Sequence, residues 1–168
     1  TTNFKVKVSD GLIKDAGVPD ITGGATLNYT STIEKGLRLY SSTPATLATI
    51  DVYGTVSSTI TIKLIHSKTE IVAGSKTILI APGLNTIPLG FYFPGNVTFD
   101  LMVFASTPLT ASTSGFNFPL NIPGSPVTIT GYVDSIYHTT SDFNNIYNLK
   151  FSTGCLSNST NFAATVYP

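Results

Sequence analysis

The sequence has little charge. Only 11% of its 168 residues are charged, whereas about 25% is usual in soluble domains, and nine bases balance nine acids. Such a chain offers no basic patch to hold a phosphate backbone, so we expect no nucleic acid partner. The bases are also uneven, because Lys150 is the only one after residue 80. The second half must therefore rely for solubility on Ser, Thr and Asn, on attached groups, or on burial against partners.

Residue types that commonly build catalytic and metal sites are scarce. The two histidines, His66 and His138, belong to no HExxH or His-x-His pattern, and no Gly-x-Ser-x-Gly elbow is present. Asp134 and Asp142 lie near His138, but isolated histidines are more often loop or strand-end residues than ligands. The single cysteine, Cys155, excludes a disulfide within the chain. We therefore expect no enzyme activity, no cofactor and no metal.

Tryptophan and long apolar runs are absent. Carbohydrate-binding β-sandwiches usually present a flat platform of aromatic side chains, most often of Trp, and this chain has no Trp. No run of about 18 or more apolar residues occurs, so we expect no membrane span. The chain begins at Thr1 rather than Met, which leads us to expect a processed protein.

What the sequence does contain is strand after strand. Residues 59–65 alternate apolar and polar side chains most clearly, and residues 97–104 become apolar on both faces, as in a central strand. No segment of ten or more residues has a 3.6-residue period. The pattern predicts an all-β protein, an antiparallel β-sandwich of Ig-like or jelly-roll-like type. Its further strands are expected at residues 47–56, 76–80, 84–93, 116–122, 127–133, 146–151 and 162–167.

Turn signals separate these strands. The triplet at residues 34–36, Glu-Lys-Gly, predicts a hairpin between strands at residues 25–33 and 37–40. Residues 106–114, rich in Ser, Thr and Pro, predict a bridge between strands. Pro-Gly dipeptides ending at Gly83, Gly95 and Gly124 predict type II turns, in which φ of the glycine is positive.

The first strand stands apart from the others. Its apolar and polar positions alternate, and a segment containing three prolines or glycines per ten residues follows it. We expect a donor strand at residues 1–13, a flexible linker at residues 14–24 and one sandwich domain at residues 25–168. A tethered terminal strand can complete its own sheet or the sheet of another molecule. The strand positions are apolar Phe4, Val6 and Val8, and polar Asn3, Lys5, Lys7 and Ser9.

Three N-glycosylation sequons are present, at Asn28, Asn96 and Asn158. Each has a residue other than Pro in the middle position and Thr in the third. They predict N-linked glycans on an exported protein. A chain rich in Thr and Asn also produces sequons by chance, so any one of them is as readily unused as used.

The alternating Phe4-Val6-Val8 strand, the glycine-bearing segment and the sequons together resemble the glycosylated thread filaments on the surface of crenarchaea. A second resemblance is to archaeal bundling pilins related to bacterial biofilm-matrix fibre proteins. The thread family implies a sandwich that lacks one strand, with residues 3–9 filling the groove of the next identical subunit. It implies an extracellular, cell-surface homopolymer with a role in adhesion or biofilm formation.

Threads are also thought to carry isopeptide cross-links, which join a lysine amine to an Asn or Asp side chain. Lys63, Lys150 and Asp100 are the candidate participants, because each falls in an apolar strand. The alternative for each is a side chain that simply points away from its sheet. The alternative for the whole protein is a monomeric, secreted β-sandwich that binds carbohydrate or a surface.

Overall fold

A computed structural model describes residues 2–6, 13–17, 21, 26–113, 118–121, 123–134, 144–153 and 160–164. Within this part every regular element is a strand, which confirms the all-β prediction. The same residues include no helix suited to crossing a bilayer. The strands are β1 (Thr2–Val6), β2 (Ile13–Ala16), β3 (Thr26–Ser41), β4 (Ala45–Gly54), β5 (Ser58–His66), β6 (Val72–Ile80), β7 (Gly83–Phe93), β8 (Val97–Ser112), β9 (Val127–Asp134), β10 (Tyr147–Ser152) and β11 (Thr160–Ala164).

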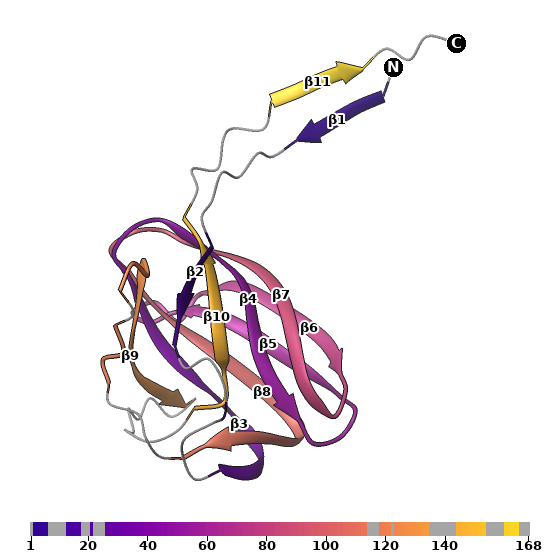
Figure 1. Cartoon of the computed structure of the whole chain (residues 1–168), viewed down its shortest axis with the longest axis vertical. Coiled ribbons are helices and arrows are strands. Elements are labelled where there is room, and N and C mark those ends of the chain that lie inside the picture. Colours follow the sequence, from indigo (N-terminus) through magenta and orange to yellow (C-terminus); the bar gives the residue numbers. More distant parts are fainter. Residues whose placement is uncertain are drawn as a thin grey trace.

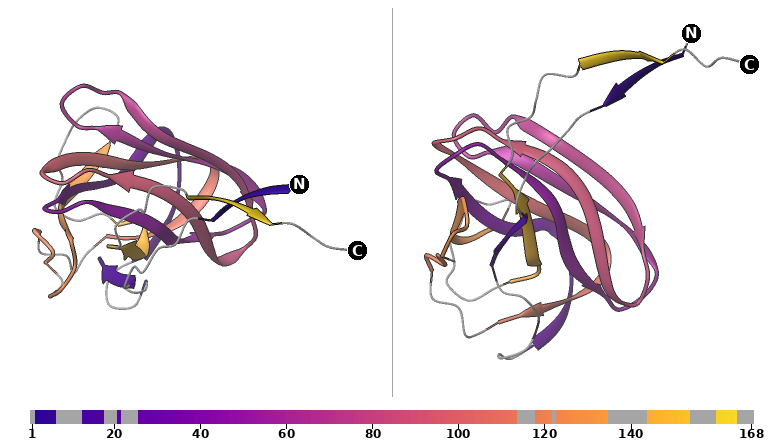
Figure 2. Two further views of the ribbon diagram at one scale, coloured as in Figure 1. Left: turned by 90° about the horizontal axis from the view of Figure 1, so that it is seen from above. Right: turned by 45° about the horizontal axis from the view of Figure 1, so that its top comes forward.

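Nine of the strands form one antiparallel sheet that curls over itself into two layers (Figures 1 and 2). One layer has the order β6-β5-β8-β3-β9, and the other has the order β7-β4-β10-β2. The long strand β8 joins them. Its first part lies between β3 and β5, as expected of a strand that is apolar on both faces, and Leu109 and Thr110 then pair with Gly54 and Tyr53 of β4.

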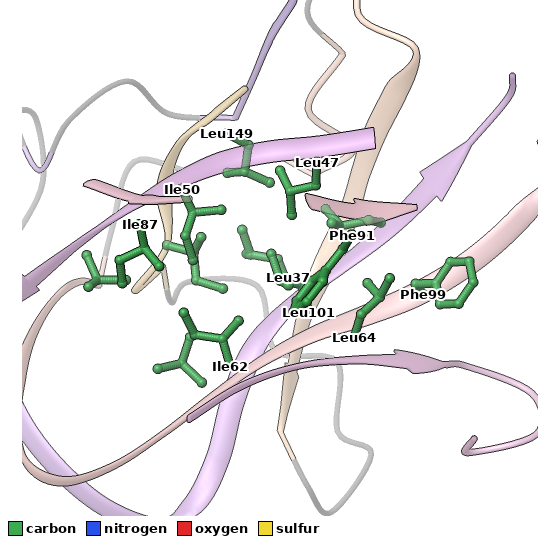
Figure 3. Packing of buried hydrophobic residues seen from close by; sticks show 14 of the residues in the cluster. Leu37, Leu47, Ile50, Ile62, Leu64, Ile87, Phe91, Phe99, Leu101 and Leu149 are labelled. Atoms are coloured by element: carbon green, nitrogen blue, oxygen red, sulfur yellow. The ribbon is translucent and has the colours of Figure 1, made fainter. Parts of the chain in front are cut away.

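The space between the layers is filled by one hydrophobic cluster (Figure 3). The strand β5 shows how sequence alternation builds it, because Ile60, Ile62 and Leu64 are buried while the residues between them are not. Aromatic rings join the layers: Phe93 of β7 meets the ring of Phe99 of β8 edge-on at 5.2 Å and that of Phe151 of β10 at 5.5 Å. The core therefore unites both layers in a single sandwich.

The hairpin expected around residues 34–36 is wrong. The chain continues through this point as the 16-residue strand β3, with register shifts between Tyr29 and Lys35. Gly36 serves close packing rather than a turn, because a Cβ there would lie 1.8 Å from the carbonyl oxygen of Leu101. The expected bridge at residues 106–114 is likewise wrong up to Ser112, because β8 runs to that residue as the partner of β3.

The expected linker also begins differently. Lys14, Asp15 and Ala16 belong to β2, which pairs with β10, so residues 14–16 are part of the sheet rather than a flexible segment. Of the strand expected at residues 116–122, the described part makes one isolated bridge, between Leu120 and Ile129 of β9. Local pattern did not reveal either arrangement, since each depends on a distant strand edge.

Two of the three Pro-Gly turns have the expected glycine geometry, with φ of 89° at Gly83 and 81° at Gly124. At Pro94-Gly95 the positive φ falls instead on the next residue, Asn96, at 60°. Asparagine tolerates this left-handed conformation better than most residues with a side chain. The shift brings the middle sequon into the turn itself.

Candidate functional site

The N-terminal strand β1 lies outside the nine-stranded sheet. It pairs antiparallel with β11 in a two-stranded sheet, with Phe4 opposite Phe162 and Val6 opposite Thr160. Figure 1 shows this pair beyond one end of the body, where both termini lie. Of the residues expected in the donor strand, Asn3, Phe4, Lys5 and Val6 fall in β1, and Lys7, Val8 and Ser9 lie outside the described residues.

The strands β2 and β10, which follow β1 and precede β11 in the chain, are neighbours in the sheet. Ile13 at the start of β2 is the register partner of Ser152 at the end of β10, so the chain enters and leaves the sheet at one point. The sequence predicted a strand near β11 but gave no indication that it pairs with the first strand. Alternation within a short strand predicts which side chains share a face, but it does not say which distant strand is the partner.

The two lateral sides of the sandwich are built differently. On the β6/β7 side, strands of nine and eleven residues face each other, and Lys76 of β6 donates a hydrogen bond to the carbonyl oxygen of Pro88 in β7. Gly74 lies so close to Phe91 that a Cβ would be 2.8 Å from the ring. Side chains thus close this side.

On the β2/β9 side, the edge strand is short. The strand β2 pairs with four residues of β10, from Leu149 to Ser152. The chain then passes Gly17, whose φ is 80° and where a Cβ would lie 2.8 Å from Cδ1 of Ile129. Because β2 and β9 stand at the two ends of the strand order, this side presents strand edges, which are templates for another strand. The β2/β9 side is therefore the better place to receive one.

Each of the three candidate isopeptide participants is paired outside that set. Lys63 donates to the carboxylate of Glu34, and Lys150 donates to the carboxylate of Asp15. Asp100 is 3% exposed and accepts two hydrogen bonds from Arg38, from Nε at 2.8 Å and from Nη2 at 3.0 Å. The register of β3 and β8 sets these two residues directly opposite each other.

The Arg38–Asp100 pair explains why a carboxylate occurs in an apolar strand. A planar guanidinium matches a carboxylate with two parallel hydrogen bonds. This hydrogen bonding to Asp100 raises the pKa of Arg38 above its usual value, against a smaller lowering caused by burial. The pair neutralises Asp100 within the sheet, and its role is structural.

The three sequons lie in different settings. Asn28 is in β3, opposite Thr110 of β8, and Asn158 lies outside the described residues. Asn96 is exposed in the turn between β7 and β8, and its backbone N–H donates to the carbonyl of Ser41 at 2.8 Å. The hydroxyl of Tyr40 donates to Oδ1 of Asn96 at 3.2 Å.

A hollow of about 250 Å³ opens beside Asn96. It is lined mainly by polar residues from the ends of β3 and β5 and the start of β8: Tyr40, His66, Ser67, Lys68, Val97 and Thr98. His66 Nδ1 accepts hydrogen bonds from the backbone N–H groups of Lys68 and Thr69, each at 3.3 Å, which leaves Nε2 to carry the ring proton. His138, the other histidine, lies outside the described residues.

The structure contains a buried polar network that the sequence did not predict. The hydroxyl of Tyr147 donates to the carbonyl of Asn144 at 2.8 Å and accepts from the backbone N–H of Ser112 at 2.9 Å. The ring of Tyr147 also meets that of Tyr53 edge-on at 5.4 Å. These contacts fasten β10 to β8, so the network supports the fold. The described residues contain no group of three His, Cys, Asp or Glu side chains arranged to hold a metal ion.

Neither the comparison with protein-family models nor that with curated proteins gives a match, so the geometry of the chain carries the functional argument.

Proposed function

We propose that this chain is the structural subunit of an extracellular surface filament, in which the N-terminal strand of one subunit inserts into a groove of the next. The filament would resemble crenarchaeal threads, with a role in adhesion or biofilm formation and with N-linked glycans on its surface. The subunit needs no catalytic site for this role.

The observation that carries the proposal is that β1 belongs to a separate sheet from the nine strands of the body. The pairing that β1 makes with β11 joins two strands at the ends of the chain, and such pairing can be exchanged for an equivalent one between molecules at little cost. Residues 7–12 separate β1 from β2 and span at most about 20 Å, which is enough to reach an adjacent body.

The β2/β9 side is the acceptor in this proposal. A strand placed there would extend the sheet beyond β2 or β9, which stand at the two ends of its strand order. Apolar donor residues would add to the interior, and each buried Phe or Val side chain contributes roughly 1.5–3 kcal/mol. Because the donor and acceptor are different surfaces, the contact is heterologous and can propagate as a fibre.

The test is electron microscopy of the intact chain and of a chain lacking residues 1–9. We expect filaments from the first and monomers from the second, with an added peptide of residues 1–9 binding the truncated protein. A sharper variant replaces Phe4 and Val6 by Asp, and its control combines Asn3→Asp with Lys5→Asn. Both doubles change the net charge by the same amount, but only the first removes apolar donor side chains.

Three outcomes would contradict the proposal. Filaments from the truncated chain would show that another surface drives assembly. Closed dimers, measured by sedimentation, would show that two molecules exchange their terminal strands reciprocally instead of forming a fibre. Monomers at all concentrations would favour a secreted binding domain instead.

A further inference from the structure

We propose that Asn96 carries an N-linked glycan whose first sugar rests in the adjacent hollow, against the ring of Tyr40. The inference deepens the proposed surface function, because it requires export, but it does not require polymerisation. It assigns a modification site, and a seat for the sugar, to one turn of the sandwich.

The turn presents the asparagine to a transferase. Asn96 is exposed, it lies with a φ of 60° in the turn between two strands, and Thr98 of the sequon follows at the start of β8. By contrast, Asn28 is paired within the sheet, opposite Thr110 of β8. A turn between two strands can enter an enzyme cleft without opening the sheet, whereas a residue paired within the sheet cannot.

The amide is oriented by Tyr40. The tyrosine hydroxyl donates to Oδ1, the atom that glycosylation leaves in place, so this hydrogen bond persists after modification. The sugar is added to Nδ2. In that step the N–C bond to the anomeric carbon forms while the bond from that carbon to the phosphate of a lipid-linked oligosaccharide breaks. The phosphate leaves with the bonding electron pair, and Nδ2 loses one proton.

The hollow suits a single sugar ring in volume and chemistry. It measures about 250 Å³, and its lining includes the polar residues His66, Lys68 and Thr98. Sugar hydroxyls donate and accept hydrogen bonds, so such a mixed lining fits them. Tyr40 is 36% exposed and adds an aromatic surface with a polar tip.

The experiment compares the intact protein produced in an N-glycosylating secretory host with the same chain from a host that lacks N-glycosylation. Peptide mass spectrometry measures occupancy at Asn96, and thermal unfolding measures Tm. We expect a sugar on Asn96 and a Tm higher by about 2–4 °C in the glycosylated protein. The variant Asn96→Gln, made in both hosts, separates the contribution of this site to the Tm difference from the contribution of any other glycan.

The seat is tested with Tyr40→Ala and its matched control, Tyr92→Ala, which removes an exposed ring from β7. We expect Tyr40→Ala to abolish the Tm difference between the two hosts, Tyr40→Phe to retain part of it, and Tyr92→Ala to retain all of it. An unmodified Asn96 overturns the site, and a Tm difference that survives Tyr40→Ala overturns the seat. Filament formation is measured separately. A glycosylated Asn96 on a protein that stays monomeric would contradict the proposed polymerisation but not the proposed glycan site.

Discussion

The two lateral sides of the sandwich show two ways to finish a β-sheet. The β6/β7 side ends in long strands whose side chains close the gap, with Lys76 held against a carbonyl of β7. The β2/β9 side ends in a strand of four residues that is continuous with the tail. An inward lysine on an edge strand is a recognised protection against pairing with another chain. The β6/β7 side is thus protected against pairing with another chain, whereas the β2/β9 side ends in the short strand that follows the N-terminal segment.

The largest effect that tests this comparison comes from the strand next to β2. Phe151 of β10 is fully buried against Phe93, so Phe151→Ala should lower the free energy of unfolding by about 3–5 kcal/mol. Ile13 of β2 is 66% exposed, and Ile13→Ala should change it by less than about 0.5 kcal/mol. Urea unfolding measures both. Equal losses would mean that β2 itself closes this side.

A matched pair of glycines compares the packing of the two sides. Gly74→Ala on β6 would force a Cβ within 2.8 Å of the Phe91 ring, and should destabilise the protein by about 1–3 kcal/mol. Gly131→Ala on β9 meets nothing within 4 Å, and should leave stability unchanged or raise it by about 0.5–1 kcal/mol. Chemical denaturation measures both changes in stability. A loss of stability in Gly131→Ala as large as that in Gly74→Ala would show that the β2/β9 side is packed as closely as the β6/β7 side.

The pH dependence of stability tests whether the side chain of Tyr132 in β9 is buried. Burial, and then the charge of Asp134, raises the pKa of Tyr132 above its usual value near 10. Between pH 10 and the raised pKa, the unfolded chain binds fewer protons than the folded one, so stability falls as pH rises. The slope from this group is at most about 1.4 kcal/mol per pH unit. Tyr132→Phe should remove it, and an unchanged slope above pH 10 would contradict the assignment.

The smallest effect on stability should come from Lys76→Ala, at about 0.5 kcal/mol or less, because the side chain lies near the surface. Its effect on association should be larger, since the β6 edge loses its inward charge. Light scattering at increasing protein concentration measures this. Lys68→Ala makes the same charge change in a turn and is the control, and equal scattering from both variants would assign no protective role to Lys76.

Sequence pattern predicted the strands that repeat a simple alternation. Residues 59–65 lie within β5, and residues 97–104 lie within the first part of β8, between two neighbours as their apolar faces require. These predictions succeed because side-chain period and burial are local properties of a strand.

Features that depend on distant partners were missed. Gly36 was interpreted as part of a turn, whereas its role follows from the carbonyl of Leu101, 65 residues away in sequence. The pairing of β1 with β11 and the Tyr40–Asn96 contact likewise join segments that no short window contains. The tertiary register decides such contacts, and local propensity carries no information about it.

The short ladder between β2 and β10 has a mechanical consequence in a filament. Tension on the tail would enter the body at Ile13 and act along the axis of β2, parallel to β10. The hydrogen bonds of an antiparallel pair are perpendicular to its strands, so this force loads them in shear and all together rather than peeling them one at a time. Gly17, wedged against Ile129 and Leu149 at the inner end, would resist slippage. Four residues of strand could thus hold a pull that a longer pair, opened from its end, would not.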